Sequence, residues 1–514
     1  MRTKRYFLNT FVAFLLQLVT MISGFILPKV MLVNYGSEIN GLTSSINQFI
    51  TYFNLAQAGI AGASLYAFYK PIADNDQESA NGVMSATDKY YKRSGIWFTV
   101  FILVFAIAYP FIVKINLAYY EIFLLVLVLS FSSILTYLII GKYRAFLSAN
   151  QQAYILSLAS LITVILNTTI VSILAYFQLN VVFVRMAGGL ASLISVAFVY
   201  FYVKTRYKWL STKSKPNYES LSRRGYVMYL EILGAIQGGW PVIVATLIFA
   251  KDLSQVSILA VYSMVLGGIA GIFSIFTTGT QAAFGDLIVR KDTNKLQETY
   301  KEFETAFYWL MTWAYACTLI LIMTFIQLYT KSLEDAEIYI RPWLGALLVI
   351  NGIFNHLKTP QGMMVTAAGM YKETRYRITI QATIGLVFST LFGYLFHLWF
   401  SLGLEGIITG MILGHLYRTI DLLFYTPKHI TGLKWQYSLR RILRVILTVT
   451  ICYIPFFFIE YQPPSFLWWI VLAVIVAIYV FVVTLVMHLI FDRKIVKKLF
   501  KRITLLFKKK SRQS

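Results

Sequence analysis

Charged residues are scarce in this chain, and acidic residues are scarcer than basic ones. Only 13% of the 514 residues are charged, with 22 Asp and Glu against 46 Lys and Arg. A soluble globular chain carries about 25% charged residues, so this composition excludes an ordinary water-soluble domain. The two cysteines, Cys317 and Cys452, lie in separate apolar runs. Their spacing excludes a disulfide framework and a cysteine-based metal site.

Signatures of catalysis are also missing. The sequence contains no Gly-x-x-x-x-Gly-Lys-Ser/Thr phosphate loop, no His-Glu-x-x-His motif and no Gly-x-Ser-x-Gly motif. These absences exclude an ATP-driven pump built into this chain and the common metallohydrolase and serine-hydrolase sites. We therefore expect a protein that is not an enzyme, with no catalytic residues, no metal site and no cofactor.

Long apolar runs dominate what is present. Hydrophobic residues make up 58% of the chain, in continuous runs of roughly 18 to 25 residues that suit membrane-spanning helices. We predict an all-α polytopic membrane protein with about fourteen transmembrane helices. The expected spans begin near residues 6, 39, 95, 120, 151, 181, 226, 257, 306, 342, 379, 406, 442 and 466.

Basic residues fall in alternate loops between these runs. The formal net charge is +24, and its densest segments are Lys204 to Arg224 and the tail from Arg493 to Lys510. Lys and Arg are concentrated on the cytoplasmic side of membrane proteins. We therefore expect both termini in the cytoplasm and a multi-pass protein of the cell (inner) membrane, in contact with membrane lipids. The charge then reports orientation, and no nucleic-acid partner is expected.

An internal repeat organises the chain. The segment Ile39–Asp76 aligns without gaps with Val256–Thr293, an offset of 217 residues, and farther on Phe146–Tyr154 aligns with Val365–Glu373. A parallel repeat predicts two six-helix lobes around a central cavity, followed by two extra C-terminal helices. The predicted domains are 1–224 (helices 1–6 and a cytoplasmic linker), 225–441 (helices 7–12) and 442–514 (helices 13–14 and a basic tail).

Polar side chains inside the apolar runs are the candidate site residues. An ionisable group in the bilayer core costs about 2.5 to 3.5 kcal/mol, so it needs a partner, a cavity or a function. Amides can bind sugar hydroxyls, and cations can bind a pyrophosphate group. We predict a substrate cavity lined by Lys29, Asn47, Asn54, Arg185, Asn351, Asn355 and Lys358.

Several of these residues have an alternative role. Lys29 follows Pro28, where we expect the helix to break, and it either binds an anionic head group or extends to the outer interface. The polar stripe that holds Asn47 and Asn54 serves either sugar binding or helix packing.

A second group contains candidates for H⁺ or Na⁺ coupling. Glu231 is the carboxylate best suited to this role, unless it pairs with Arg223 or Arg224 at the cytoplasmic end of its span. Arg418 and Asp421, three residues apart, are expected to pair within one helix. A lone histidine on an apolar helix is more often a packing residue. The candidates are Glu231, His356, His415, Arg418 and Asp421.

Two segments carry a resemblance to a known family. They read ILPKVMLVNYGSEINGLTSSINQFITYFNLAQAGI, from Ile26, and AFYKPIADNDQES, from Ala67. Together with the duplicated lobes, they resemble the polysaccharide biosynthesis (Wzx-type) flippases of the multidrug/oligosaccharidyl-lipid/polysaccharide exporter (MOP) superfamily. The likeness covers nearly the whole chain, and its motifs are loose.

The resemblance implies a two-lobe transporter that alternates between inward and outward openings. Its substrate would be a polyprenyl-pyrophosphate-linked oligosaccharide repeat unit, moved from the inner to the outer leaflet for a capsule or exopolysaccharide. A polysaccharide polymerase or assembly complex would be its partner. The alternatives are a multidrug or cation antiporter of the same fold, and a membrane polysaccharide polymerase or glycosyltransferase, which needs a larger outside loop.

Overall fold

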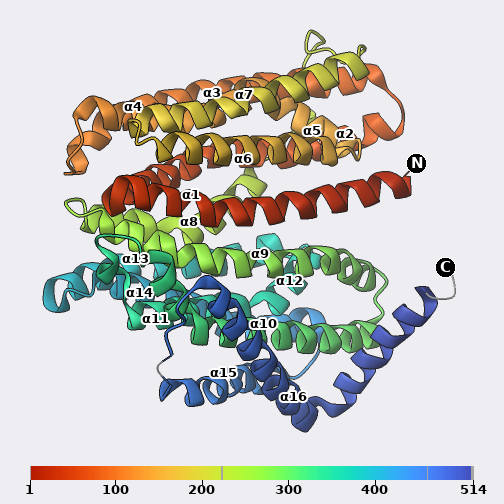
Figure 1. Cartoon of the computed structure of the whole chain (residues 1–514). Helices are drawn as coiled ribbons and strands as arrows, with labels where there is room; N and C mark the ends of the chain where they lie inside the picture. Colours follow the sequence, from red (N-terminus) through yellow and green to blue (C-terminus); the bar gives the residue numbers. More distant parts are fainter. Residues whose placement is uncertain (1, 222–223, 460, 511–514) are drawn as a thin grey trace. The chain divides into compact units, whose positions relative to one another are not determined.

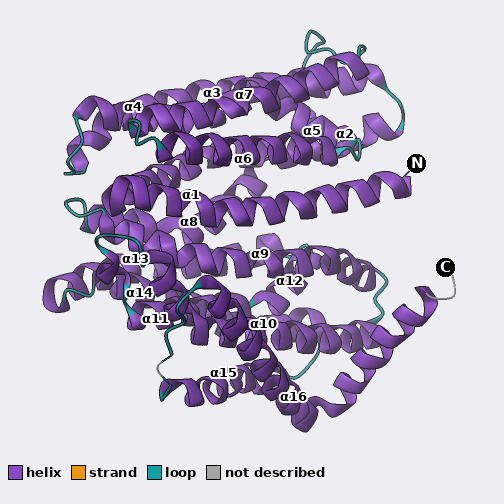
Figure 2. Cartoon of the chain, in the orientation of Figure 1, coloured by secondary structure: helices purple, strands orange, loops and turns teal. Residues whose placement is uncertain are grey.

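The computed structural model describes residues 2–221, 224–459 and 461–510, and every regular element in these ranges is a helix (Figures 1 and 2). The predicted all-α class is therefore confirmed. Contacts divide the chain into two compact units, Met1–Val261 and Tyr262–Ser514. The domain boundary expected after residue 224 stays a prediction.

The first unit is built around the long helix α1, which packs against α6 and α8. Helices α6 and α7 pack against each other, α4 packs against α3 and α7, and α2 packs against α5 and α8. The elements are α1 (Arg2–Phe53), a 3-10 turn (Asn54–Gln57), α2 (Ala58–Ala73), α3 (Gln77–Ile112), α4 (Tyr119–Leu135), a π turn (Thr136–Ile140), α5 (Gly141–Ala149), α6 (Ala153–Tyr176), α7 (Val181–Arg206), a 3-10 turn (Glu219–Leu221) and α8 (Arg224–Ile248).

Helix α1 spans what the sequence predicted as two helices. The expected break at Pro28 is wrong, because α1 continues through this residue. The non-helical residue is Gly36, with φ 79° and ψ 175°. Only glycine adopts such a backbone without steric cost, so the chain bends where glycine permits it and not where proline removes one amide hydrogen.

Helix α9 (Ser254–Val289) begins in the first unit and ends in the second. In the second unit α10 packs against α11, α15 and α16, while α14 packs against α11 and α13. The remaining elements are α10 (Thr293–Thr330), a 3-10 turn (Ala336–Tyr339), α11 (Pro342–Leu357), α12 (Thr359–Ala367), α13 (Tyr371–Phe400), α14 (Gly403–Thr426), a π turn (Pro427–Thr431), α15 (Trp435–Phe457) and α16 (Phe466–Lys510).

Eleven helical segments among the described residues are long and apolar enough to span a membrane. The chain is therefore a multi-pass membrane protein. Three features separate this number from the predicted fourteen. Helix α1 joins two expected spans, Ile232–Ile248 is shorter than a typical span, and α15 begins with several arginines. The count of fourteen stays a prediction.

Candidate functional site

Lys358 lies at the junction of two helices in the second unit. It follows the last residue of α11 and precedes the first residue of α12, with Pro360 in the first turn of α12. Its Nζ atom is 2.9 Å from Nδ1 of His415 on α14. Gln381 Nε2, on α13, is 3.3 Å from the same ring nitrogen. Because an ammonium nitrogen is a donor only, His415 Nδ1 accepts the hydrogen bond from Lys358 and the ring proton lies on Nε2.

Lys358 has no carboxylate within ion-pair distance in the described part of the chain. Its hydrogen bond to His415 fixes the ammonium group in place but does not neutralise it. A held cation without a counter-ion at membrane depth is suited to bind an anion.

His356, which lies beside this junction, is held by its own helix. Its Nδ1 atom lies 2.9 Å from both the Gly352 carbonyl oxygen and the Tyr315 hydroxyl. The ring packs against Phe273, with 4.7 Å between the ring centroids. These contacts fit the packing role that the sequence left open, and they leave ion coupling by His356 a prediction.

Arg418 and Asp421 form the predicted pair within α14, with 2.5 Å between Nη1 and Oδ2. Both are nearly inaccessible, with side-chain exposures of 5% and 6%. Asp421 also pairs with Arg377, which comes from α13 and which the sequence reading did not place here. The carboxylate therefore serves two guanidinium groups and does not compensate Lys358.

Two of the predicted amides lie on α11. Asn351 and Asn355 are both half-buried. The Asn351 side-chain oxygen is buried and has no hydrogen-bond partner. An unsatisfied buried polar atom costs free energy, so it is a place where a ligand hydroxyl could be accommodated.

The first unit contains two of the predicted cavity residues with orphaned atoms. Asn54 donates to Ser133 Oγ at 2.9 Å, but its Oδ1 atom is buried and unpartnered. Arg185 on α7 has a buried Nε without a partner and no ion pair among the described residues. A ligand with acceptor and hydroxyl groups would satisfy both side chains.

The remaining candidates in this unit are less well placed. Asn47 is exposed, and its backbone oxygen accepts a hydrogen bond from Thr51 at 2.8 Å. Lys29 is half-buried on α1. The side chain of Glu231 lies outside the described residues, so its coupling role stays a prediction.

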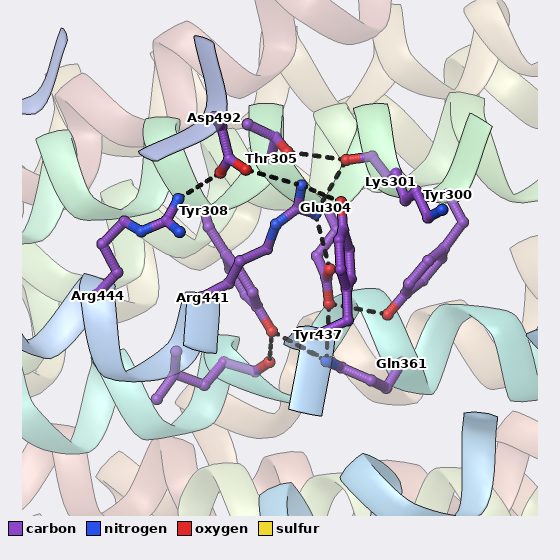
Figure 3. A network of polar contacts seen from close by, with 11 residues as sticks. Tyr300, Lys301, Glu304, Thr305, Tyr308, Gln361, Tyr437, Arg441, Arg444 and Asp492 are labelled. Carbon is purple, nitrogen blue, oxygen red and sulfur yellow. Dashed lines mark hydrogen bonds and ion pairs between the residues drawn. The ribbon is translucent and has the colours of Figure 1, made fainter. Parts of the chain in front are cut away.

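Apart from Arg418–Asp421, sequence reasoning missed the buried ion pairs. Glu304 on α10 pairs with Arg441 on α15 at 2.9 Å, and Arg441 and Arg444 both contact Asp492 on α16 (Figure 3). In the first unit, Asp88 and Lys142 are 2.5 Å apart. Glu304 lies among polar residues near the start of α10, so no apolar run singled it out.

Among the described residues, no group of three or more His, Cys, Asp or Glu side chains could hold a metal ion. The candidate sites therefore consist of cations, amides and ion pairs.

No family model matches the chain, and no curated protein sequence is detectably similar to it. Solved structures share its fold. A multidrug resistance MATE family transporter of the MOP superfamily, in an inward-facing conformation, superposes with a TM-score of 0.66 at 16% identity, covering 86% of this chain and 99% of its own. Lipid II flippase MurJ, in an inward closed conformation, also gives 0.66 at 13% identity, covering 95% of this chain and 100% of its own.

A further MATE structure, in complex with MaL6, gives a TM-score of 0.55 at 16% identity and covers 85% of this chain and 97% of its own. The fold expected from the resemblance is confirmed, because it is the fold of these transporters and of this flippase. These three similar proteins are MATE transporters and a lipid flippase. At these identities the likeness concerns the fold, and the Wzx-type branch remains a prediction.

Proposed function

We propose that this protein is a flippase for lipid-linked oligosaccharides. It moves polyprenyl-pyrophosphate-linked repeat units from the inner to the outer leaflet of the cell membrane by alternating access, with both termini in the cytoplasm. Its products feed a surface polymer such as capsule or exopolysaccharide, through a polymerase or assembly complex.

The uncompensated charge of Lys358 carries this proposal. Arg418 and Arg441 are buried and Arg444 is half-buried, and each has a carboxylate partner. In the described part of the chain, Lys358 contacts His415 and no carboxylate, and it is half-buried like Asn351 and Asn355. A pyrophosphate supplies the missing negative charge, and sugar hydroxyls suit amide oxygens that lack donors.

The shared fold supports a lipid-linked substrate in particular. The match with the lipid II flippase extends over 95% of this chain, against 86% for the MATE transporter. A cation exporter would place acidic groups in its binding site, whereas Arg185 and Lys358 are basic. Coupling to H⁺ or Na⁺ through Glu231, His415 or the Arg418–Asp421 pair is part of the proposal.

The test measures in which leaflet the lipid-linked sugar accumulates, using a probe that reacts only from outside the cell. Cells that depend on Lys358→Glu should accumulate the intermediate on the cytoplasmic leaflet, although the variant is present at the normal level in the membrane. Lys114→Glu is the matched control, because Lys114 is an exposed loop residue and receives the same charge change. This control should transport normally.

Two results would contradict the proposal. A normal leaflet distribution in cells without the protein would refute flipping, and altered drug tolerance in the same cells would favour the antiporter. Wild-type transport by Lys358→Glu would refute the role of the cation.

A further inference from the structure

Glu304 on α10 is completely buried, with a side-chain exposure of 0%. Its cationic partner is Arg441, 4% exposed, whose Nη1 lies 2.9 Å from Glu304 Oε2. Arg441 belongs to α15, and most of this helix lies beyond the two repeated lobes that the sequence predicts. The counter-ion of this buried carboxylate therefore comes from the first turns of α15, where the predicted second lobe (225–441) ends.

The other oxygen of this carboxylate is held from within the lobe. Glu304 Oε1 accepts hydrogen bonds from Tyr300 Oη at 3.0 Å and from Gln361 Nε2 at 3.1 Å (Figure 3). Both of these partners are neutral. Arg441 is thus the cation that compensates Glu304 among the described residues.

The first unit also contains a carboxylate paired with a cation, but there the cation comes from a helix within the first lobe. Asp88 on α3 pairs with Lys142 on α5 at 2.5 Å. The alignment of Phe146–Tyr154 with Val365–Glu373 also aligns Lys142 with Gln361. The alignment with an offset of 217 residues places Asp88 opposite the residue that follows Glu304. Where the first lobe has a lysine of its own, the second lobe has a glutamine.

Two ring pairs independently support these two registers. Phe98 contacts Tyr137 with 4.9 Å between centroids. The aligned residues are Tyr315 and His356, and they also contact each other, with 5.7 Å between centroids. The same pairs of helices therefore meet through aligned residues in each unit.

The Glu304 cluster also holds the backbone on both sides of Lys358. Tyr308 Oη donates to the Leu357 carbonyl oxygen at 2.7 Å, and Gln361 Nε2 is 3.1 Å from Tyr308 Oη. Leu357 ends α11 and Gln361 lies in the first turn of α12. The position of Lys358 is therefore fixed by residues whose arrangement depends on a compensated Glu304.

Arg441 is itself firmly held. Its Nη2 atom donates to Tyr437 Oη at 2.5 Å and lies 3.6 Å from Asp492 Oδ1, and Asp492 also pairs with Arg444 (Figure 3). Asp492 is the non-helical residue at the kink of α16. Three elements, α10, α15 and α16, thus converge on one guanidinium group.

We propose that Arg441 is a positioning residue for Lys358. It takes, for the second lobe, the place that Lys142 has in the first, and it makes α15 an integral part of the α11–α12 junction. The effect on transport rests on the proposed function, whereas the effect on the junction does not.

The experiment compares four variants of the full chain: Arg441→Met, Gln361→Lys, the double variant, and Arg440→Met as a matched control. Arg440 is the exposed neighbour of Arg441 on the same helix. Purified proteins in detergent are followed by thermal unfolding and by amide hydrogen exchange of residues 357–361. The leaflet assay is run in parallel.

Arg441→Met should lower the unfolding midpoint by several degrees, accelerate exchange at residues 357–361 and block transport. Adding Gln361→Lys should restore most of all three, because the lysine supplies the cation from within the lobe as Lys142 does. Arg440→Met should behave as wild type in every assay.

The proposal is overturned if the double variant is no better than Arg441→Met, or if exchange at 357–361 does not change. If protection from exchange is lost and restored as expected while the leaflet distribution stays normal in every variant, the positioning of the junction stands and the flippase function fails.

Discussion

Replacing Gly410 by alanine should force apart the closely packed helices α13 and α14. A Cβ atom at Gly410 would lie 2.1 Å from the backbone nitrogen of Ser389 and 2.3 Å from the carbonyl carbon of Phe388, whereas ordinary contacts begin at 3.4 Å. The shortfall is 3.4 minus 2.1, or 1.3 Å, and backbone atoms cannot rotate away. Overpacking of this kind costs about 1 to 3 kcal/mol, less up to about 1 kcal/mol gained in helix propensity.

Gly385→Ala on the facing helix is the matched control. A Cβ atom there meets only the Met411 sulfur at 3.6 Å, which is an ordinary contact. This variant should be as stable as wild type or more stable, because alanine favours the helix.

The assay is thermal unfolding of the purified protein in detergent with a thiol-reactive dye. Cys452 is fully buried and Cys317 is partly buried, so both report loss of structure in the second unit. Gly410→Ala should label at a lower temperature than Gly385→Ala. Equal midpoints for the two variants would refute the close backbone approach.

Two further predictions concern the first unit. Lys142→Met leaves the buried Asp88 with only the half-exposed Lys92, 2.9 Å away. This substitution should lower the free energy of unfolding by about 2 to 3 kcal/mol, which is less than the roughly 3 to 5 kcal/mol expected when a buried pair is broken completely. In unfolding measurements, the double variant Lys142→Met/Asp88→Leu should regain most of this stability. Asp76 caps α3 by accepting from Ser79, and these hydrogen bonds lower the pKa of its carboxyl. The stabilisation by the Asp76 carboxylate is therefore present above the ordinary aspartate pKa and is lost as pH falls through the lowered pKa. The Asp76→Asn variant should consequently lose less stability than wild type on acidification. Parallel plots of stability against pH for the two proteins would contradict this assignment.

Hydropathy predicts helices well where the sequence is strongly apolar and poorly where a helix begins with polar turns. The strongly apolar runs of α4, α6 and α7 gave helices near the expected positions. Helix α10 was expected from residue 306 but begins at Thr293, where Asp292 caps it by accepting from Lys295 N at 3.1 Å. Its first turns are polar, so a search for apolar runs placed Glu304 outside the span.

The candidate site was predicted in part. The Arg418–Asp421 pair follows from a spacing of three residues on one helix, and the structure contains it. The contact between Lys358 and His415 joins α11 to α14 across 57 residues of sequence. Both residues were named as candidates, but their contact depends on how the two helices pack, and no local spacing encodes that.

The sequence by itself predicted the class of protein, the strongly apolar helices and an internal repeat, because these follow from local hydropathy and from aligned residues. It also located Lys358, since a lysine within an apolar run is costly wherever the run packs. Only the tertiary structure decided that Lys358 has no carboxylate partner among the described residues and that Arg441 compensates Glu304. Charge compensation depends on distances of a few ångströms between helices far apart in sequence, and those distances are set by packing.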